Sequence, residues 1–310
     1  MSSTVEVAHV EKSAQGLPWS LWLRQTLAIL RLEVKKNFLS RRAVLIYLLA
    51  LLPIMLVVAM AVFGGHERTE VNVLDQQGHV VSHSVRERSG PLADFSQYPL
   101  IFSALYSALI LRTVVFFGCA WIFMNLFRGE LVDRSLHFYF LSALRREVLV
   151  AGKYFSGLLT SIILFTSVTA ASMLIIYFGG AYRESLRYFS DGPGLGQLFT
   201  YMSITVLACI GYGAFFLVIG LFFRNPIIPA LVLYGWEWLN FLLPPLLKKI
   251  SVIHYLQSLT PVPLPEGPFA IVAEPTPAWI SVPCLLLVTA AVLVGASIRI
   301  RRMEIRYGSE

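Results

Sequence analysis

The sequence has 310 residues, of which 56% are hydrophobic and only 14% are charged, with a net charge of +7. Because soluble domains carry about 25% charged residues, a chain this poor in charge is not a soluble globular protein. The positive charge does not indicate nucleic acid, since the basic residues lie beside apolar stretches, where they set membrane topology. We therefore expect a membrane protein without a nucleic-acid partner.

We expect residues 1–42 to form a cytoplasmic lead. Its segment 19–38 has an amphipathic pattern, with apolar residues on one side of the predicted helix and basic residues largely on the other. The apolar residues at helical spacing are Trp19, Trp22, Leu23, Leu27, Leu30, Val34 and Phe38. This pattern predicts a helix lying among the lipid headgroups of the inner interface, with a soluble partner-binding helix as the alternative. The apolar run that starts at residue 43 lacks a small-residue cleavage pattern, so we expect it to remain as a membrane helix.

Six apolar stretches of 20 to 28 residues follow. As helices they are long enough to cross a hydrocarbon core of roughly 30 Å. They are residues 43–63, 100–127, 154–178, 198–223, 227–247 and 279–298. The predicted fold class is an all-α membrane protein, with a six-helix transmembrane domain at 43–298 and a cytoplasmic tail at 299–310.

The loops between these stretches differ in their content of Lys and Arg. If both termini lie on one side, that side carries 17 basic residues and the other side carries 7. The positive-inside rule then predicts cytoplasmic termini and a cytoplasmic loop at 128–153. The predicted outer loops are 66–98, 181–197 and 248–278.

Two of the outer loops have patterns of their own. In the first, Val71, Val73, Val80 and Val81 flank a turn that contains Gly78, which predicts a small β-hairpin. Histidine and glutamate residues nearby lack a clear second ligand pair, so we predict a solvated surface and no metal. In the last loop, six prolines favour an extended connection, and its start at 250–259 is amphipathic enough for a short interfacial or re-entrant helix.

No catalytic signature occurs in the sequence. The motifs HExxH and GxSxG are absent, and the Gly152–Lys153 pair has Glu147 and Tyr154 where a P-loop needs glycine and a hydroxyl residue that binds magnesium. We therefore expect no enzyme activity and no cofactor bound by this chain. The three cysteines lie in different apolar stretches, and we interpret them as packing residues.

Only two charged residues, Arg112 and Glu237, lie inside the apolar stretches. Arg112 is 16 residues from Arg128, or about 24 Å along a helix. It is therefore either an anchor near the outer headgroups or part of an outward vestibule. Glu237, between Trp236 and Trp238, must be neutral, paired or facing water. It either bonds to a neighbouring helix or lies in a transport path.

The charged loop 128–153 carries a resemblance. An acidic residue after the second stretch precedes a Leu-Ser-Ala-Leu-Arg turn and then a Gly-Lys pair at the next helix. This order resembles the membrane subunits of ABC-2-type transporters, the permeases of the type V exporter fold. The matching residues are Glu130, Leu141, Ser142, Arg145, Gly152 and Lys153, whereas Ala143 replaces the usual proline.

The resemblance implies a permease for export in the inner membrane of a bacterial-type cell. The apolar, aromatic-rich stretches are compatible with a hydrophobic or amphipathic substrate, while an ion or a polysaccharide stays open. The permease would pair with a second permease subunit, usually a copy of itself, and with two cytoplasmic ABC ATPase subunits that bind ATP and magnesium. The residues expected to couple to the ATPase are Glu130, Arg134, Arg145, Arg146, Glu147 and Lys153. The candidate pathway residues are Arg112, Phe116, Phe117, Trp236, Glu237 and Trp238.

Two other functions remain open at this point. An ion- or proton-coupled secondary transporter would use Glu237, although such proteins normally show internal repeats, and residues 1–150 and 151–310 show no convincing self-similarity. A non-transporting membrane scaffold or immunity protein of the same fold is the third possibility.

Overall fold

The computed structural model describes residues 19–39, 43–63, 71–74, 80–83, 95–132, 146–179, 182–223, 225–264 and 275–301. This part of the chain is largely helical, with one pair of short strands. Five of its helical segments are long and apolar enough to cross a membrane. The chain is therefore a multi-pass, mainly helical membrane protein, as its composition predicts.

The amphipathic lead forms helix α1 (Trp19–Leu39), and the first apolar stretch forms α2 (Ala43–Phe63). Both were predicted as helices, and both are confirmed. α1 packs against α6 (Arg146–Phe178), where Ile29 lies over Gly152. A Cβ atom at Gly152 would lie 3.1 Å from the Ile29 side chain, so the absence of a side chain at that position lets the two helices approach closely. That α1 lies in a membrane interface stays a prediction.

The predicted hairpin of the first outer loop is confirmed as two strands, β1 (Val71–Leu74) and β2 (Val80–His83). They pair antiparallel, with Val73 opposite Val81. This register places β-branched residues opposite each other across the pair, an arrangement that favours antiparallel pairing.

The second membrane segment is one long helical run. It consists of η1 (Phe95–Gln97), α3 (Tyr98–Leu105), the π-helical η2 (Tyr106–Val115) and α4 (Phe116–Val132). The hydroxyl of Thr113 donates to the carbonyl of Ala108, five residues earlier, which fits the wider π-helical turn. Because π-helical turns are frequent at functional sites, η2 is a place to look for functional residues.

Three further predicted spans are confirmed as helices, within α6, α8 (Gly194–Phe222) and α12 (Ala278–Arg301). All three helices begin before the predicted starts. An apolar run predicts which residues contact lipid, and a helix can begin before its first lipid-contacting residue. The predicted loop 181–197 also contains a short helix, α7 (Tyr182–Ser190).

The core lies where α4, α6 and α8 meet, and α8 is the most deeply buried of the five long segments. A Cβ atom at Gly220 of α8 would lie 2.8 Å from the Cα atom of Met124 in α4. Backbone approach of this kind is what small residues permit between membrane helices.

The predicted fifth span is corrected by the structure. Instead of one helix over 227–247, the chain forms α9 (Ile227–Trp238), the 3₁₀-helix η3 (Leu239–Leu242), α10 (Pro245–Lys248) and α11 (Val252–Ser258). α9 rises about 18 Å, less than the roughly 30 Å of a hydrocarbon core. The run breaks at Leu243 and Pro244, which both lie directly before a proline and have extended backbone, the conformation that a following proline favours.

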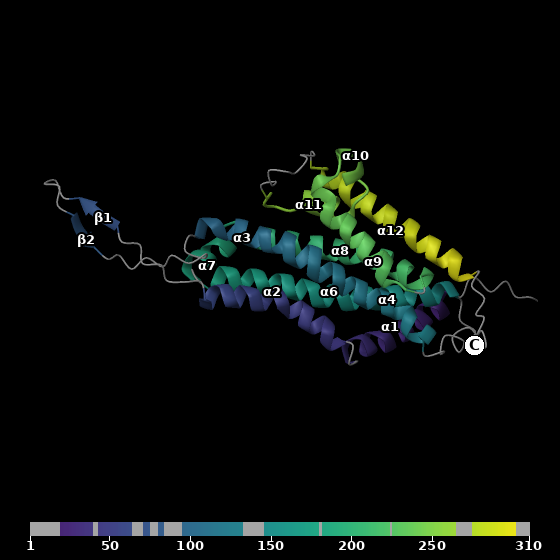
Figure 1. The fold of residues 1–310 in the computed structure, drawn as a ribbon. Helices are drawn as coiled ribbons and strands as arrows, with labels where there is room; N and C mark the ends of the chain where they lie inside the picture. The colour runs from purple at the N-terminus through teal and green to yellow at the C-terminus, as the bar shows by residue number, and fades with distance from the viewer. Residues whose placement is uncertain are drawn as a thin grey trace, which may run out of the picture.

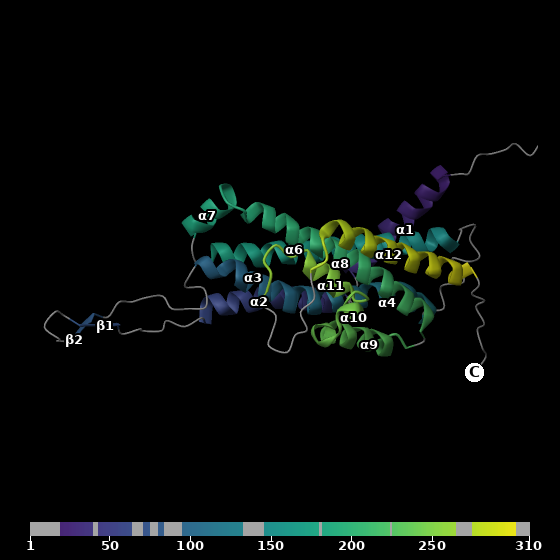
Figure 2. The same cartoon turned by 90° about the horizontal axis from the view of Figure 1, so that it is seen from above.

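Figures 1 and 2 show how these elements are arranged along the bundle. α1 and the last turn of α12 lie at one end, and α3 and α7 lie at the other. α10 and α11 lie partway along the bundle, short of the end formed by α3 and α7. The broken fifth segment thus places non-helical backbone partway along the length of the bundle.

Candidate functional site

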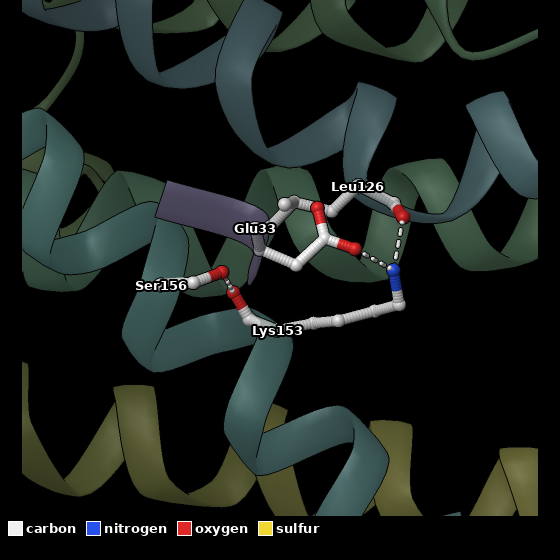
Figure 3. A network of polar contacts seen from close by, with 4 residues as sticks. All are labelled: Glu33, Leu126, Lys153 and Ser156. Carbon is white, nitrogen blue, oxygen red and sulfur yellow. Dashed lines mark hydrogen bonds and ion pairs between the residues drawn. The ribbon is translucent and has the colours of Figure 1, made fainter. Parts of the chain in front are cut away.

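Two buried polar networks include predicted site residues, and the first ties α1 to α6 and α4 (Figure 3). The Lys153 ammonium lies 2.9 Å from a carboxylate oxygen of Glu33 and donates to the carbonyl of Leu126 at 2.8 Å. Lys153 and Glu33 are 0% and 2% exposed. We call this contact the α1–α6 ion pair. Because a buried charge that loses its partner is strongly unfavourable, the pair fixes α1 in place on the bundle.

The α1–α6 ion pair changes how one predicted coupling residue is understood. Lys153 is fully buried, so its side chain offers no surface to a soluble ATPase, and any part that it takes in coupling is through α1. Glu33 was missed by the sequence reasoning. The signal was present, because an acidic residue sits between Leu30 and Val34 of the apolar stripe.

The other predicted coupling residues lie in the sequence between the end of α4 and the start of α6. Glu130 belongs to the last turn of α4, and Arg146 and Glu147 open α6. Arg134 and Arg145 lie outside the described residues. Their role in coupling stays a prediction.

The second network centres on Glu237, at the end of α9. Its carboxylate is 4% exposed. It accepts hydrogen bonds from four donors: the Ser251 hydroxyl at 2.8 Å, the backbone N–H groups of Val252 at 3.0 Å and Ile253 at 2.8 Å, and the Tyr212 hydroxyl at 3.3 Å. Glu237 therefore caps the start of α11 from a different helix. A carboxylate satisfies the free N–H groups of a helix start and is favoured there by the helix dipole.

The Glu237 cap agrees with the first of the two interpretations that the sequence left open, a hydrogen bond to a neighbouring element. It holds the two sides of the proline break together, since α9 lies before Pro244 and α11 after it. A place for Glu237 in a transport path stays a prediction.

Arg112 of η2 is close to this cap but is not paired with it. Its guanidinium has electrostatic contact with Tyr212, Glu237 and Tyr234, yet it makes no ion pair with Glu237 within 4.0 Å. The Nη2 atom lies 3.5 Å from the side-chain oxygen of Gln257 in α11, and the Nε atom has no hydrogen-bond partner. Arg112 thus lies among residues of α8, α9 and α11.

Aromatic rings surround the polar groups. Phe116 is buried against Tyr212, Phe216 and Tyr234, with ring centroids 4.9 to 5.3 Å apart. Phe117 is partly exposed and lies 4.7 Å from the ring of Tyr234. The fold therefore brings four of the six predicted pathway residues, Arg112, Phe116, Phe117 and Glu237, to one place.

The two remaining pathway candidates are tryptophans of α9. Trp236 is partly exposed, and Trp238 is 51% exposed on the outer surface of the helix. The sequence reasoning missed four polar residues that complete the site: Tyr212, Tyr234, Ser251 and Gln257. A hydroxyl group in an apolar stretch was the available signal for the two tyrosines, and nothing local distinguished Ser251 or Gln257.

No group of three or more His, Cys, Asp or Glu residues suited to a metal ion occurs among the residues that the structure describes. The side chains of the histidines in the first outer loop lie outside that set. Comparison with family models, with curated proteins and with solved structures finds no match for this chain.

Proposed function

We propose that the chain is the membrane-spanning permease subunit of an ATP-binding cassette exporter. Two copies would form the translocation path in a bacterial inner membrane, and two separate cytoplasmic ATPase subunits would supply the energy. The proposal is supported by the five apolar helices and by the residues of loop 128–153 that resemble ABC-2-type permeases.

The observation that carries the proposal is the α1–α6 ion pair. In a permease without its own ATPase, the conformational change of a soluble ATPase partner has to be transmitted to the membrane helices. Glu33 attaches α1 to Lys153 near the start of α6, and Lys153 in turn donates to the carbonyl of Leu126 near the end of α4. These are the two helices that loop 128–153 connects, so a force on the loop or on α1 acts on one joined unit.

The alternative of a proton-coupled transporter is less well supported. A carboxylate that carries protons has to release and take up a proton during each cycle. Both oxygens of Glu237 accept hydrogen bonds, including two from the backbone of α11. Protonation would remove acceptor capacity and disrupt the start of that helix, which favours a structural role for this group.

The proposal is tested first by asking what accompanies the chain. We expect an ABC ATPase subunit to copurify with the tagged full chain from its native membranes, and its ATPase activity to rise when the two are joined. Charge reversal at Arg145 and Arg146 should reduce copurification and stimulated ATPase activity about tenfold or more, since each lost ionic contact at a protein interface typically costs at least that much in affinity.

A matched control reverses two arginines at the opposite end of the bundle. Arg183→Glu with Arg187→Glu, in α7, makes the same change in net charge on exposed side chains. This double variant should copurify with the ATPase normally. Vectorial movement of a solute by the purified chain alone, in vesicles without nucleotide, would overturn the proposed function.

A further inference from the structure

The guanidinium of Arg112 has more hydrogen-bond donors than the protein uses. An arginine side chain carries five N–H donors in a planar fork. Among the described residues, the guanidinium makes one hydrogen bond, at 3.5 Å to Gln257, and the buried Nε atom has no hydrogen-bond partner. Among the described groups with electrostatic contact to Arg112, one is an acid, Glu237.

Glu237 does not take up these donors, because its carboxylate is turned toward the start of α11. Its Oε2 atom accepts three hydrogen bonds and its Oε1 atom accepts one, and two of the four come from backbone groups of α11. A turn of the carboxylate toward Arg112 would leave the N–H groups of Val252 and Ile253 buried without acceptors. Leaving a buried donor unsatisfied costs about 1–3 kcal/mol for each group, so the positive charge of Arg112 stays available.

The surroundings of Arg112 combine this charge with an aromatic surface. Arg112, Gln257, Phe117 and Tyr234 are each only partly buried, so the side chains are reachable. Phe117 and Tyr234 lie ring against ring at 4.7 Å, and Tyr234 is within electrostatic reach of Arg112. A charged fork beside two partly exposed rings suits a molecule with a charged head and an apolar body.

We propose that Arg112, Gln257, Phe117 and Tyr234 form a binding site for an amphipathic molecule with a carboxylate or phosphate head. The guanidinium donates two parallel hydrogen bonds to the anionic oxygens, and the two rings contact the apolar body. This inference rests on the proposed function, because it names the class of substrate that the permease carries.

Charge decides the class of head group. A carboxylate or phosphate matches the planar fork of an arginine in bidentate fashion, and such charge-assisted bonds are stronger than those to neutral acceptors. A cationic head is repelled. An alcohol has one oxygen and no charge, so it satisfies at most one donor and leaves the guanidinium uncompensated in an apolar environment.

The test uses purified full chain and four probes with the same twelve-carbon tail: dodecanoate, dodecyl phosphate, dodecanol and dodecyltrimethylammonium. Binding of labelled dodecanoate is measured by equilibrium dialysis in a neutral detergent, with the other three as competitors. We expect the two anions to bind about tenfold or more tightly than the alcohol, the ratio for one lost hydrogen bond to a charged group. Equal competition by all four probes, or preference for the cation, would overturn the proposal.

Three variants locate the effect. Arg112→Gln should remove the preference for anions, and Arg112→Lys should retain part of it, since lysine keeps the charge without the fork. Arg183→Gln, at an exposed arginine of α7, should bind like the unaltered chain. An unchanged preference for anions in Arg112→Gln would contradict the proposal. If Arg112→Gln does not fold, Arg112→Lys and the competition series still test it.

Two further comparisons identify the source of the anion and separate this proposal from the proposed function. Competition by inorganic phosphate or acetate alone would assign the site to free anions, and competition only by the amphiphiles would assign it to lipid-like molecules. Competition only by the amphiphiles supports the proposal, whereas equally strong competition by the free anions would overturn the part that assigns an apolar body to Phe117 and Tyr234. If an ATPase subunit copurifies but no preference for anions exists, only the binding site is wrong. If the preference exists and no ATPase subunit is found, only the permease proposal is wrong.

Discussion

Two of the places where the described residues hold charge inside the bundle differ in how the charged groups are satisfied. At the α1–α6 ion pair, Lys153 and Glu33 are each other's partners, and a backbone carbonyl accepts a further hydrogen bond from the ammonium. Near the Glu237 cap, the acid and the base are neighbours without being partners. Glu237 bonds to α11 and Tyr212, and Arg112 is left with a single long contact to Gln257.

This difference separates structural attachment from binding capacity. In a closed pair the two buried charges are each other's partners, so the pair joins two helices and leaves neither charge for a ligand. An arginine with unused donors, beside a carboxylate that is bonded to another helix, retains its affinity for an incoming anion. The same residue types therefore serve different purposes, and the hydrogen bonds around each group decide which.

The largest effect should follow from opening the closed pair. Lys153→Met removes the cation, keeps much of the side-chain volume and leaves Glu33 buried without its partner. We expect the free energy of unfolding to fall by about 3–5 kcal/mol, measured by detergent titration of the purified chain. α1 should also become accessible to proteolysis.

Two further variants test whether this loss comes from the pair itself. Lys35→Met removes an exposed cation of α1 and should leave stability nearly unchanged. Glu33→Leu combined with Lys153→Met removes both charges and should recover most of the loss, because apolar side chains can replace a buried ion pair. If the double variant is as unstable as Lys153→Met alone, the α1–α6 ion pair is not what holds α1.

A smaller effect is expected at the Glu237 cap. Glu237→Gln keeps the shape of the side chain but replaces one acceptor oxygen with an amide that faces N–H donors. We expect a loss of about 2 kcal/mol, with faster hydrogen exchange at the amides of Val252 and Ile253. Assembly should persist, while transport or its coupling to ATP should change. Unaltered exchange at these two amides would contradict the assignment of Glu237 as the cap of α11.

The smallest effect should come from the longest bond of the cap. Tyr212→Phe removes a donor that lies 3.3 Å from Glu237 and retains the ring that packs on Phe116. Thermal unfolding should show a loss of about 1 kcal/mol. Tyr182→Phe, on an exposed tyrosine of α7, is the control and should change nothing. A loss at Tyr212 as large as that of Glu237→Gln would mean that Tyr212 does more than complete the cap.

Local patterns were sufficient for several elements of the fold. The apolar stripe from Trp19 to Phe38 predicted α1, and the alternating valines predicted the strands of the hairpin. The amphipathic start of the last outer loop predicted the short helix α11. Each of these patterns is a periodicity in neighbouring residues, and periodicity is what secondary structure imposes on a sequence.

The fifth apolar stretch shows where that reasoning fails. Hydropathy extended it to Leu247. Pro244 and Pro245 near its end did predict a kink or an end of the helix, and the break at these prolines is confirmed. Apolar character is compatible both with a membrane helix and with a buried broken segment, so composition could not choose between them. The π-helical η2 left no comparable signal, since its residues are ordinary for a membrane helix.

By itself, the sequence determined that this chain belongs in a membrane, where its main apolar helices run and which residues carry charge among them. Those properties depend on the transfer free energy of consecutive side chains, which adds up locally. Only the tertiary structure decided that Glu33 meets Lys153, that Glu237 caps α11 and that Arg112 keeps unused donors. The partners in these contacts are 14 to 145 residues apart in the chain, and hydrogen bonds at 3 Å require a backbone geometry that no local pattern specifies.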